Sequence, residues 1–224
     1  MRISIIIPTL NEAAYIARAV RRARRTPGVE VIVADGGSAD GTARIARECG
    51  AEVVTASGGR AAQMNAGAKA ATGEALVFLH ADTTLPDGFD RHVRGMFTRP
   101  DVVAGAFRLK VASQHPALRL IERLANFRSR AFGLPYGDQA IFILAGTFRV
   151  AGGFPVMPIM EDFAFMRRVG RFGQVKLAHA SVVTSARRWE RLGVLRTTLI
   201  NQAVILGYMA GVPPERLAMW YREL

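Results

Sequence analysis

Short apolar runs alternate with segments of helical periodicity through the first half of the chain. Ile3–Ile7, Val29–Ala34 and Ala75–Leu79 contain almost no polar residues, and such runs predict strands buried on both faces. Between the first two runs, Ile16 and Val20 lie one helical turn apart on a common face. This alternation predicts an α/β fold, with a mostly parallel sheet flanked by helices.

The expected elements are regular in the first half and less regular in the second. We expect strands over Ile3–Ile7, Val29–Ala34, Glu52–Thr55 and Ala75–Leu79, and helices over Ala13–Arg25, Gly41–Glu48 and Ala61–Ala71. Later strands are expected over Val103–Lys110 and Ala140–Leu144, with helices over Pro116–Arg130 and Asp162–Val169 and two C-terminal helices from Val194 onward, broken at Pro213-Pro214. At 224 residues, the chain suits one domain covering residues 1–224.

The net charge of +12 comes almost wholly from arginine, because the chain has only three lysines. The guanidinium fork suits phosphate, so an anionic substrate, an anionic membrane surface and nucleic acid are possible partners, beside an ordinary solvated basic surface. Nucleic-acid binding would require arginines interleaved with exposed aromatic side chains. Phe78, Phe107 and Phe142 instead lie inside apolar runs, so we expect no nucleic-acid partner.

Cysteine usage and hydropathy indicate a cytoplasmic protein. Cys49 is the only cysteine, so no internal disulfide can form. The run Ile3–Ile7 is too short for a signal peptide, and Ala203–Val212 falls short of the roughly 18 to 20 apolar residues of a spanning helix. Peripheral contact with the inner face of a membrane is the alternative to a purely cytoplasmic location.

The first C-terminal helix carries more apolar surface than a lone terminal helix usually exposes. Its apolar residues are Leu195, Leu199, Val204, Leu206 and Met209, and the arginines just upstream or at its start are Arg187, Arg188, Arg191 and Arg196. The helix could close the core, form a homodimer interface or rest on anionic lipid. Because Asn201 and Gln202 interrupt the apolar stripe, we favour core packing or dimerisation.

Polar clusters follow each of the first four strands. They are Thr9-Leu10-Asn11-Glu12, Asp35-Gly36, Ser57-Gly58-Gly59-Arg60 and His80-Ala81-Asp82-Thr83. The carboxyl ends of parallel strands meet at one edge of a sheet, where ligands bind in such folds. Asp35 either forms a turn with its glycines or accepts a hydrogen bond from a nucleobase. Gly58-Gly59-Arg60 either starts a helix or forms an anion site at its N-terminus, with Gln63 and Asn65 nearby.

His80 and Asp82 face the same side of an extended chain. Asp82 can then supply an oxygen ligand to Mg²⁺ or Mn²⁺ bound to phosphate, or it caps the helix after Pro86. His80 is either an ordinary strand-end histidine or a neutral partner for ribose or a metal-bound water. In the second case, its protonation would weaken donor binding toward about pH 6. His179 is a further candidate ligand of the ion.

Two later polar clusters complete the candidate site. Glu161-Asp162 begins a short helix after Pro158; the pair either favours the first turn of that helix or includes a general base for an acceptor hydroxyl. Asp138 and Gln139, just before another strand, offer polar groups for the acceptor.

Together these residues resemble glycosyltransferase family 2, which has the GT-A fold with a Rossmann-like sheet, along essentially the whole chain. The matching motifs are Pro8-Thr9-Leu10-Asn11-Glu12, Asp35-Gly36-Gly37-Ser38, Asp40-Gly41-Thr42, Asn65-Ala66-Gly67, His80-Ala81-Asp82 and Glu161-Asp162. The chain also resembles a compact bacterial subgroup, associated with arsenosugar biosynthesis, through residues 59–65, 79–83 and 185–189.

The resemblance implies an inverting, metal-dependent transfer from a nucleoside diphosphate sugar, often UDP-linked, to an unidentified small-molecule or lipid-linked acceptor. The donor-binding residues it implies are Pro8, Thr9, Asn11, Glu12, Asp35, Gly36, Arg60, Gln63, Asn65, His80, Ala81 and Asp82. Asp82 would hold the divalent ion, Mn²⁺ or Mg²⁺, and Asp162 would be the base, with Glu161 beside it. Asp138, Gln139, Arg188 and Trp189 would contact the acceptor and diphosphate. Residues 1–105 would bind the donor, 106–190 the acceptor, and 191–224 would form C-terminal helices.

Three positions depart from the family pattern. His80 replaces the first aspartate of the metal motif, Met64 stands where many relatives have arginine, and Ser185 replaces the glutamine of Gln-x-x-Arg-Trp. Arg60, one turn from Met64, could supply the missing charge. The third departure argues against a processive polymer synthase. A nucleotidyltransferase, which would have no need for Asp162, or an inactive sugar-nucleotide binder is the alternative function.

Overall fold

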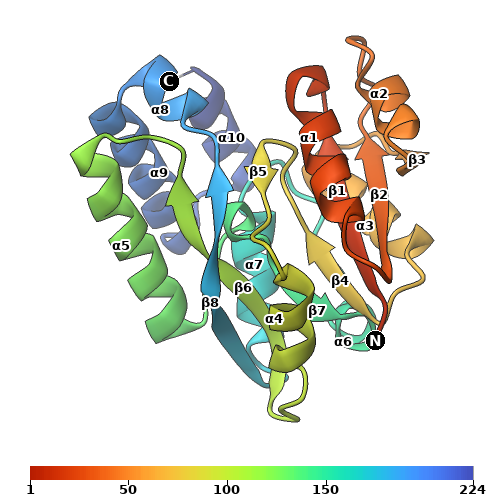
Figure 1. Ribbon diagram of the computed structural model, residues 1–224. Coiled ribbons are helices and arrows are strands. Elements are labelled where there is room, and N and C mark those ends of the chain that lie inside the picture. Colours follow the sequence, from red (N-terminus) through yellow and green to blue (C-terminus); the bar gives the residue numbers. More distant parts are fainter. Residues whose placement is uncertain (224) are drawn as a thin grey trace.

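The centre of the molecule is an eight-stranded mixed sheet (Figure 1). The computed structural model describes residues 1–223. Its strands are β1 (Ile3–Thr9), β2 (Val29–Asp35), β3 (Glu52–Thr55), β4 (Ala75–Phe78), β5 (Thr83–Thr84), β6 (Val102–Val111), β7 (Phe142–Leu144) and β8 (Gln174–Thr184). They lie in the order β3-β2-β1-β4-β7-β6-β8-β5 across the sheet.

The sheet is parallel where the sequence is most regular. β1 pairs in parallel with β2 and β4, and β3 with β2, as the buried apolar runs predict. β7 then runs antiparallel to both β4 and β6, and β5 antiparallel to β8, while β6 and β8 are parallel with two register shifts. The expected mostly parallel sheet is confirmed, with antiparallel pairs confined to β5 and β7.

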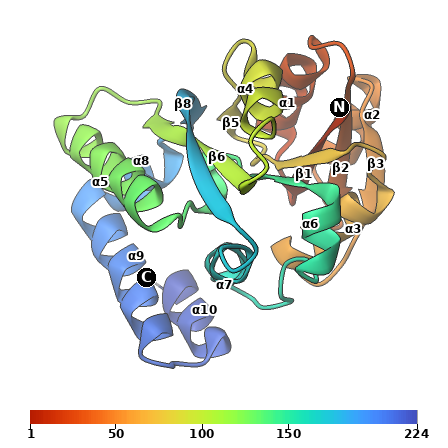
Figure 2. The same cartoon turned by 90° about the horizontal axis from the view of Figure 1, so that it is seen from below.

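Helices cover both faces of this sheet (Figure 2). They are α1 (Ala13–Arg24), α2 (Thr42–Glu48), α3 (Arg60–Ala70), α4 (Phe89–Met96), α5 (Pro116–Phe132), α6 (Ala145–Val150), α7 (Glu161–Val169), α8 (Arg187–Leu192), α9 (Val194–Met209) and α10 (Pro214–Glu223), with a short 3-10 helix at Gly137–Gln139. Side chains alternate across β1: Ile5 and Ile7 pack with residues of α1, α2 and α4, whereas Ile6 packs with residues of α3, α6 and α7.

One long strand, β8, was not predicted from the sequence. β8 carries Gln174, Lys176, His179 and Ser181 between its apolar residues, and most of its side chains are only half-buried. Without a dense apolar run it has little local signal, and its pairing with β6 comes from tertiary context. The strand matters because its carboxyl end leads directly into Ser185 and α8.

The C-terminal helices pack only partly against the rest of the molecule. Val204 of α9 is buried beside Phe163 of α7 and Leu217 of α10. The other four apolar residues expected to close the core or join a dimer are 60 to 74% exposed; they are Leu195, Leu199, Leu206 and Met209. Core packing is therefore wrong for these four. Among the described residues, no helix combines the length and apolar character that crossing a membrane requires.

Candidate functional site

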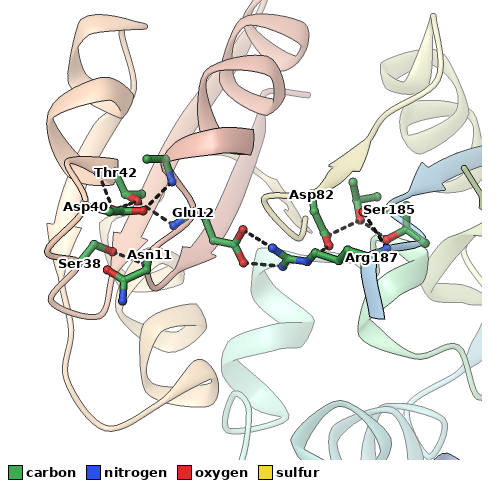
Figure 3. A network of polar contacts seen from close by, with 11 residues as sticks. Asn11, Glu12, Ser38, Asp40, Thr42, Asp82, Ser185 and Arg187 are labelled. Carbon is green, nitrogen blue, oxygen red and sulfur yellow. Dashed lines mark hydrogen bonds and ion pairs between the residues drawn. The ribbon is translucent and has the colours of Figure 1, made fainter. Parts of the chain in front are cut away.

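The loops after β1 and β2 are joined by a dense set of hydrogen bonds (Figure 3). The Asn11 backbone N–H donates to Ser38 Oγ at 2.8 Å, and its side-chain oxygen accepts from the Ala39 N–H at 2.9 Å. Thr42 Oγ1 accepts from the Glu12 N–H at 2.8 Å and donates to Asp40 at 2.5 Å. Asn11 takes a positive φ of 56°, which this short polar residue tolerates. These polar side chains shape the two loops.

Asp35 is the centre of the β2 turn. Its carboxylate, in a side chain 4% exposed, accepts hydrogen bonds from the Gly37 and Ser38 N–H groups and from the Ser38 and Thr9 hydroxyls. Burial opposes the negative charge, but these donors outweigh it and lower the pKa of Asp35. A carboxylate offers about four acceptor sites, and these four hydrogen bonds occupy that number. The contacts therefore support the interpretation of Asp35 as a turn-forming residue.

Gln63 and Asn65 are also engaged within the fold. The Gln63 amide donates to the Thr9 carbonyl at 2.9 Å, and a Cβ at Gly36 would lie 2.1 Å from that amide. Asn65 accepts from the Phe154 N–H and donates to the Phe154 carbonyl, at 2.9 and 2.8 Å. Both side chains of α3 thus hold neighbouring loops in place.

Arg187 connects the first loops to the strand-end aspartate (Figure 3). Its two terminal nitrogens donate to the Glu12 carboxylate at 2.9 and 2.6 Å, and its Nε lies 3.1 Å from Asp82 Oδ2. The guanidinium also lies 4.9 Å from the centre of the Tyr15 ring. Burial raises the pKa of Asp82, although Arg187 opposes that shift. Arg187 was expected as part of a basic segment and of the matching stretch 185–189, but not as a site residue; its place before the Arg-Trp pair was the available signal.

A cavity of about 810 Å³ opens beside this bridge. Its lining includes Asp82, Asp138 and Asp162, and the arginines that face it are Arg60, Arg187, Arg188 and Arg191. Residues of α8, α9 and α10 form one wall, so the cavity is closed by helices far along the chain from the parallel strands. A size within 300–1,000 Å³ is typical of small-molecule sites.

Asp162 and Glu161 have different surroundings although they are adjacent. The Asp162 carboxylate accepts from the Gly137 N–H and the Phe163 N–H, each at 2.7 Å, and lines the cavity. Glu161 is 1% exposed, is absent from the lining and forms an ion pair with Arg60. Glu161 therefore holds Arg60 beside the cavity, while Asp162 presents a carboxylate to it.

His80 lies on the Asp162 side of the cavity. A Cβ at Gly137 would be 3.0 Å from His80 Nε2 and 3.3 Å from Asp162 Oδ2. Burial lowers the pKa of His80 to about 3, and the positive charge of Arg60 acts in the same direction. This lowered pKa favours the neutral form of His80 at physiological pH, and the weakening of donor binding near pH 6 stays a prediction.

Asp138 and Gln139 are adjacent, but only Asp138 faces the cavity. Burial raises the pKa of Asp138 to about 6, and Asp162 adds to the shift, although Arg128 opposes it. Gln139 is fully buried; its side chain accepts from the Ser129 hydroxyl at 2.6 Å and donates to the Phe107 carbonyl at 3.2 Å. Asp138 lines the cavity and Gln139 does not.

Most of the buried polar atoms that lack a hydrogen-bond partner within residues 1–223 belong to residues of the cavity wall. Among the residues that the structure describes, four buried side-chain polar atoms have no hydrogen-bond partner, and three of them line the cavity: Asp138 Oδ1, Arg188 Nε and Trp189 Nε1. Arg188 also stacks on Tyr221, 3.7 Å from the ring centre. Buried polar groups are normally paired, so these atoms indicate a polar ligand.

The predicted site residues therefore fall into two sets. Those that line the cavity are Arg60, His80, Asp82, Asp138, Asp162, Arg188 and Trp189. Those outside its lining are Pro8, Thr9, Asn11, Glu12, Asp35, Gly36, Gln63, Asn65, Ala81, Gln139 and Glu161. His179 is exposed on β8, where Arg108 contacts it at 3.4 Å. It lies outside the cavity lining, and its role as a ligand of the ion stays a prediction.

Asp82 fits one ligand position of a divalent ion. Its carboxylate faces the cavity, and Mg²⁺ and Mn²⁺ accept one or two protein carboxylates together with phosphate oxygens and water. In the part of the chain that the structure describes, no three His, Cys, Asp or Glu side chains gather as a metal-binding group. An ion bound at Asp82 would therefore need phosphate oxygens and water as its remaining ligands.

Comparison with known proteins identifies relatives of this arrangement. The family model "Glycosyl transferase family 2" matches residues 4–151. An uncharacterized glycosyltransferase of Nostoc sp. is 29% identical over 120 residues, which is 50% of this chain and 37% of that protein. The chain thus spans well under half the length of this curated relative.

Solved structures share the fold at low sequence identity. S. aureus TarS residues 1–349 with UDP-GlcNAc gives a TM-score of 0.66 at 16% identity, over 83% of this chain and 58% of that chain. The Pyrobaculum calidifontis mannosyltransferase PcManGT, in complex with GDP-Man and Mn²⁺, gives 0.68 at 20% identity, over 98% and 68%. Mycobacterium tuberculosis glucosyl-3-phosphoglycerate synthase, in complex with Mn²⁺, UDP and glucosyl-3-phosphoglycerate, gives 0.66 at 20% identity, over 95% and 81%. These likenesses confirm the expected GT-A fold.

Proposed function

The chain belongs to glycosyl transferase family 2, and from this premise we propose that it transfers a sugar from a nucleoside diphosphate sugar to a small-molecule or lipid-linked acceptor. A UDP-linked donor is the first choice, and the reaction inverts the anomeric centre. An acceptor of arsenosugar biosynthesis is one class that the sequence resemblance favours.

The observation that carries this proposal is the composition of the cavity. It combines three carboxylates, from Asp82, Asp138 and Asp162, with four arginines and three unsatisfied buried polar atoms. A diphosphate carries several negative charges, and arginine forks are suited to its oxygens. The carboxylates supply what the arginines cannot, namely a metal ligand and a base. A site that only bound an anion would have no use for three acids.

Asp82 would hold the divalent ion, Mn²⁺ or Mg²⁺. When bound, such an ion neutralises charge on the departing diphosphate. Arg187 contacts Asp82 at 3.1 Å, so a bound diphosphate and the two carboxylates would compete for its guanidinium. Because Arg187 lines the cavity as well as contacting Glu12 and Asp82, we assign it a second role as a phosphate-binding group.

Asp162 would act as the general base. Two backbone N–H groups orient its carboxylate, which preorganises it for proton transfer. As Asp162 takes the proton of the acceptor hydroxyl, the acceptor oxygen bonds to the anomeric carbon. The bond from that carbon to the diphosphate oxygen breaks, and its electron pair leaves with the nucleoside diphosphate. Asp138, with its raised pKa and free Oδ1, is the second candidate for the base.

The loops after β1 and β2 would receive the nucleoside. Their side chains are bonded to one another, so we assign base and ribose recognition to the loop surface that they create. In this assignment residues 1–105 form the donor part, 106–190 the acceptor part, and 191–224 close the cavity, all within one domain.

The decisive experiment measures release of nucleoside diphosphate from a panel of UDP- and GDP-sugars, with Mn²⁺ and with EDTA. We expect metal-dependent release from at least one donor and its near loss in Asp82→Asn. Asp87→Asn is the matched control, because its side chain is 91% exposed and pairs only with Arg22 among the described residues. Release unaffected by EDTA or by Asp82→Asn contradicts the metal role. Pyrophosphate release from a nucleoside triphosphate would instead identify a nucleotidyltransferase.

A further inference from the structure

α5 carries two apolar faces. Its inner face, with Leu118 and Ile121, packs against Leu109 and Val111 of β6. On the opposite side, Leu120, Leu124 and Phe127 are 57, 59 and 65% exposed. Residues spaced by three and four positions lie on one side of a helix, so these three form a continuous exposed stripe along α5.

α9 repeats this arrangement. Thr197, Ile200 and Val204 form its buried side. Leu195, Leu199 and Leu206 are 74, 60 and 64% exposed, and their spacing of four and seven residues puts them on the opposite side. One polar residue, Gln202, lies within the stripe and is exposed. Each helix therefore stabilises the fold with one face and leaves a second apolar face to solvent.

The two helices lie on the same flank of the molecule, at the left in Figures 1 and 2. Ile121 and Ala125 of α5 share a packed cluster with Val194 at the start of α9. We call the surface defined by Leu120, Leu124 and Phe127 of α5 with Leu195, Leu199 and Leu206 of α9 the α5–α9 flank. Each stripe points away from the core, so the flank is a candidate docking surface.

The charges on this flank have one sign. Glu122 is the only acidic residue within Pro116–Phe132 and Val194–Met209; it is 8% exposed and paired with Arg119. Arg123, Arg130 and Arg196 are exposed, and none forms an ion pair with a residue that the structure describes. Arg123 and Arg130 are seven residues apart and therefore run along one side of the α5 stripe.

Charge also decides between the candidate partners. A second copy docking through this flank would bring the same arginines together around an apolar contact, with no exposed carboxylate on either helix to offset them. A membrane containing anionic lipid offers an apolar layer for the stripe and negative headgroups for the arginines at its edge. We propose that the α5–α9 flank binds the surface of a membrane rich in anionic lipid. This proposal is independent of the sugar-transfer reaction.

Vesicle flotation of the purified protein tests this proposal. We expect it to float with vesicles of phosphatidylcholine and phosphatidylglycerol at low salt, and to remain below with phosphatidylcholine alone. The variant Arg123→Gln/Arg130→Gln should lower the partition coefficient about 30-fold, from roughly 1 kcal/mol per arginine. Leu124→Ser/Phe127→Ser should lower it about tenfold or more, because binding scales with buried apolar area.

Val150→Ser is the matched control. Val150 is 72% exposed on α6, away from the flank, so this variant should float like the wild type. Because every substituted side chain is exposed, thermal unfolding by circular dichroism should be nearly unchanged. No flotation at low salt, equal binding to neutral vesicles, or an equal loss in Val150→Ser would overturn the proposal. A dimer in analytical ultracentrifugation that disappears in Leu124→Ser/Phe127→Ser would assign the flank to a second copy instead.

Discussion

The loops after β1 and β2 and the cavity beside Arg187 are both polar, but they use their polar groups differently. In the loops, Asp35 accepts four hydrogen bonds, and Asp40 and Thr42 are also bonded to neighbouring backbone and hydroxyl groups. In the cavity, Asp138, Arg188 and Trp189 each have a buried polar atom without a partner among the described residues.

This difference indicates that the loops fix the shape of the site, whereas the cavity carries the groups that contact a ligand. A saturated hydrogen-bond network rigidifies the backbone around it, so the loops form a fixed surface. An unsatisfied buried group lies in a higher free-energy state that a ligand can relieve. We therefore expect substitutions in the loops to change stability first, and substitutions in the cavity to change turnover or binding first.

The largest effect should come from Asp162→Asn. Loss of a general base typically costs about 10²- to 10⁴-fold in rate, so turnover should fall by that factor with donor affinity near the wild-type value. Asparagine keeps one acceptor oxygen for the two N–H groups, and the loss of stability should be roughly 1 kcal/mol. Steady-state kinetics and urea unfolding measure the two quantities. Normal turnover would remove Asp162 from the mechanism and leave Asp138 as the candidate base.

Asp35→Ala should show the opposite pattern. It removes the acceptor for four donors around a nearly buried carboxylate, and we expect a loss of about 3 kcal/mol in the free energy of unfolding. Urea denaturation gives this value, with the exposed Asp87→Ala as the control. A stable variant with a defect only in turnover would break the distinction between loops and cavity.

Arg187→Gln should affect both regions, because Arg187 bridges Glu12 and Asp82. One charge-assisted hydrogen bond to a diphosphate contributes about 1.5 to 3 kcal/mol, so affinity for a nucleoside diphosphate should fall at least about tenfold. Isothermal titration calorimetry with UDP and Mn²⁺ measures this loss. Arg191→Gln provides a comparison within the same wall, since no ion pair involves Arg191 among the described residues. Unchanged affinity in Arg187→Gln would limit Arg187 to a structural bridge.

The smallest effect concerns the pH dependence of Asp138. Its pKa is about 6 in the folded protein against an ordinary value of 3.8, so the folded state binds this proton more tightly than the unfolded state. The stability that this proton contributes is fully present below about pH 3.8 and is lost as pH rises through about 6. Asp138→Asn should therefore melt at a higher temperature than the wild type near pH 7.5. That difference should shrink toward pH 4; a constant difference would show that Asp138 titrates normally.

The regular half of the fold could be predicted closely. The expected and observed strands at Glu52–Thr55 coincide, and the helix expected over Ala13–Arg25 ends one residue earlier. These elements carry their own apolar pattern, which local sequence reveals. β8 and α8 do not, because β8 is stabilised by pairing with β6 and α8 has no buried residue. Of the cavity residues on α8, Arg187 and Arg191 were therefore missed, whereas Arg188 and Trp189 were predicted through their resemblance to a family motif.

The sequence by itself determined the parallel strands, the edge at which their loops meet, and the strand-end carboxylate of Asp82, because short-range periodicity and strand-end position encode them. Asp162, in the first turn of α7, was found through its resemblance to a family motif. Only the tertiary structure decided which polar groups remain available. Asp35 and Gln139 are saturated by partners close in space, while Asp138 keeps an unpaired oxygen and His80 is held neutral. Hydrogen-bond saturation and desolvation depend on every group packed around an atom, including groups far along the chain, so residue identity and spacing do not specify them.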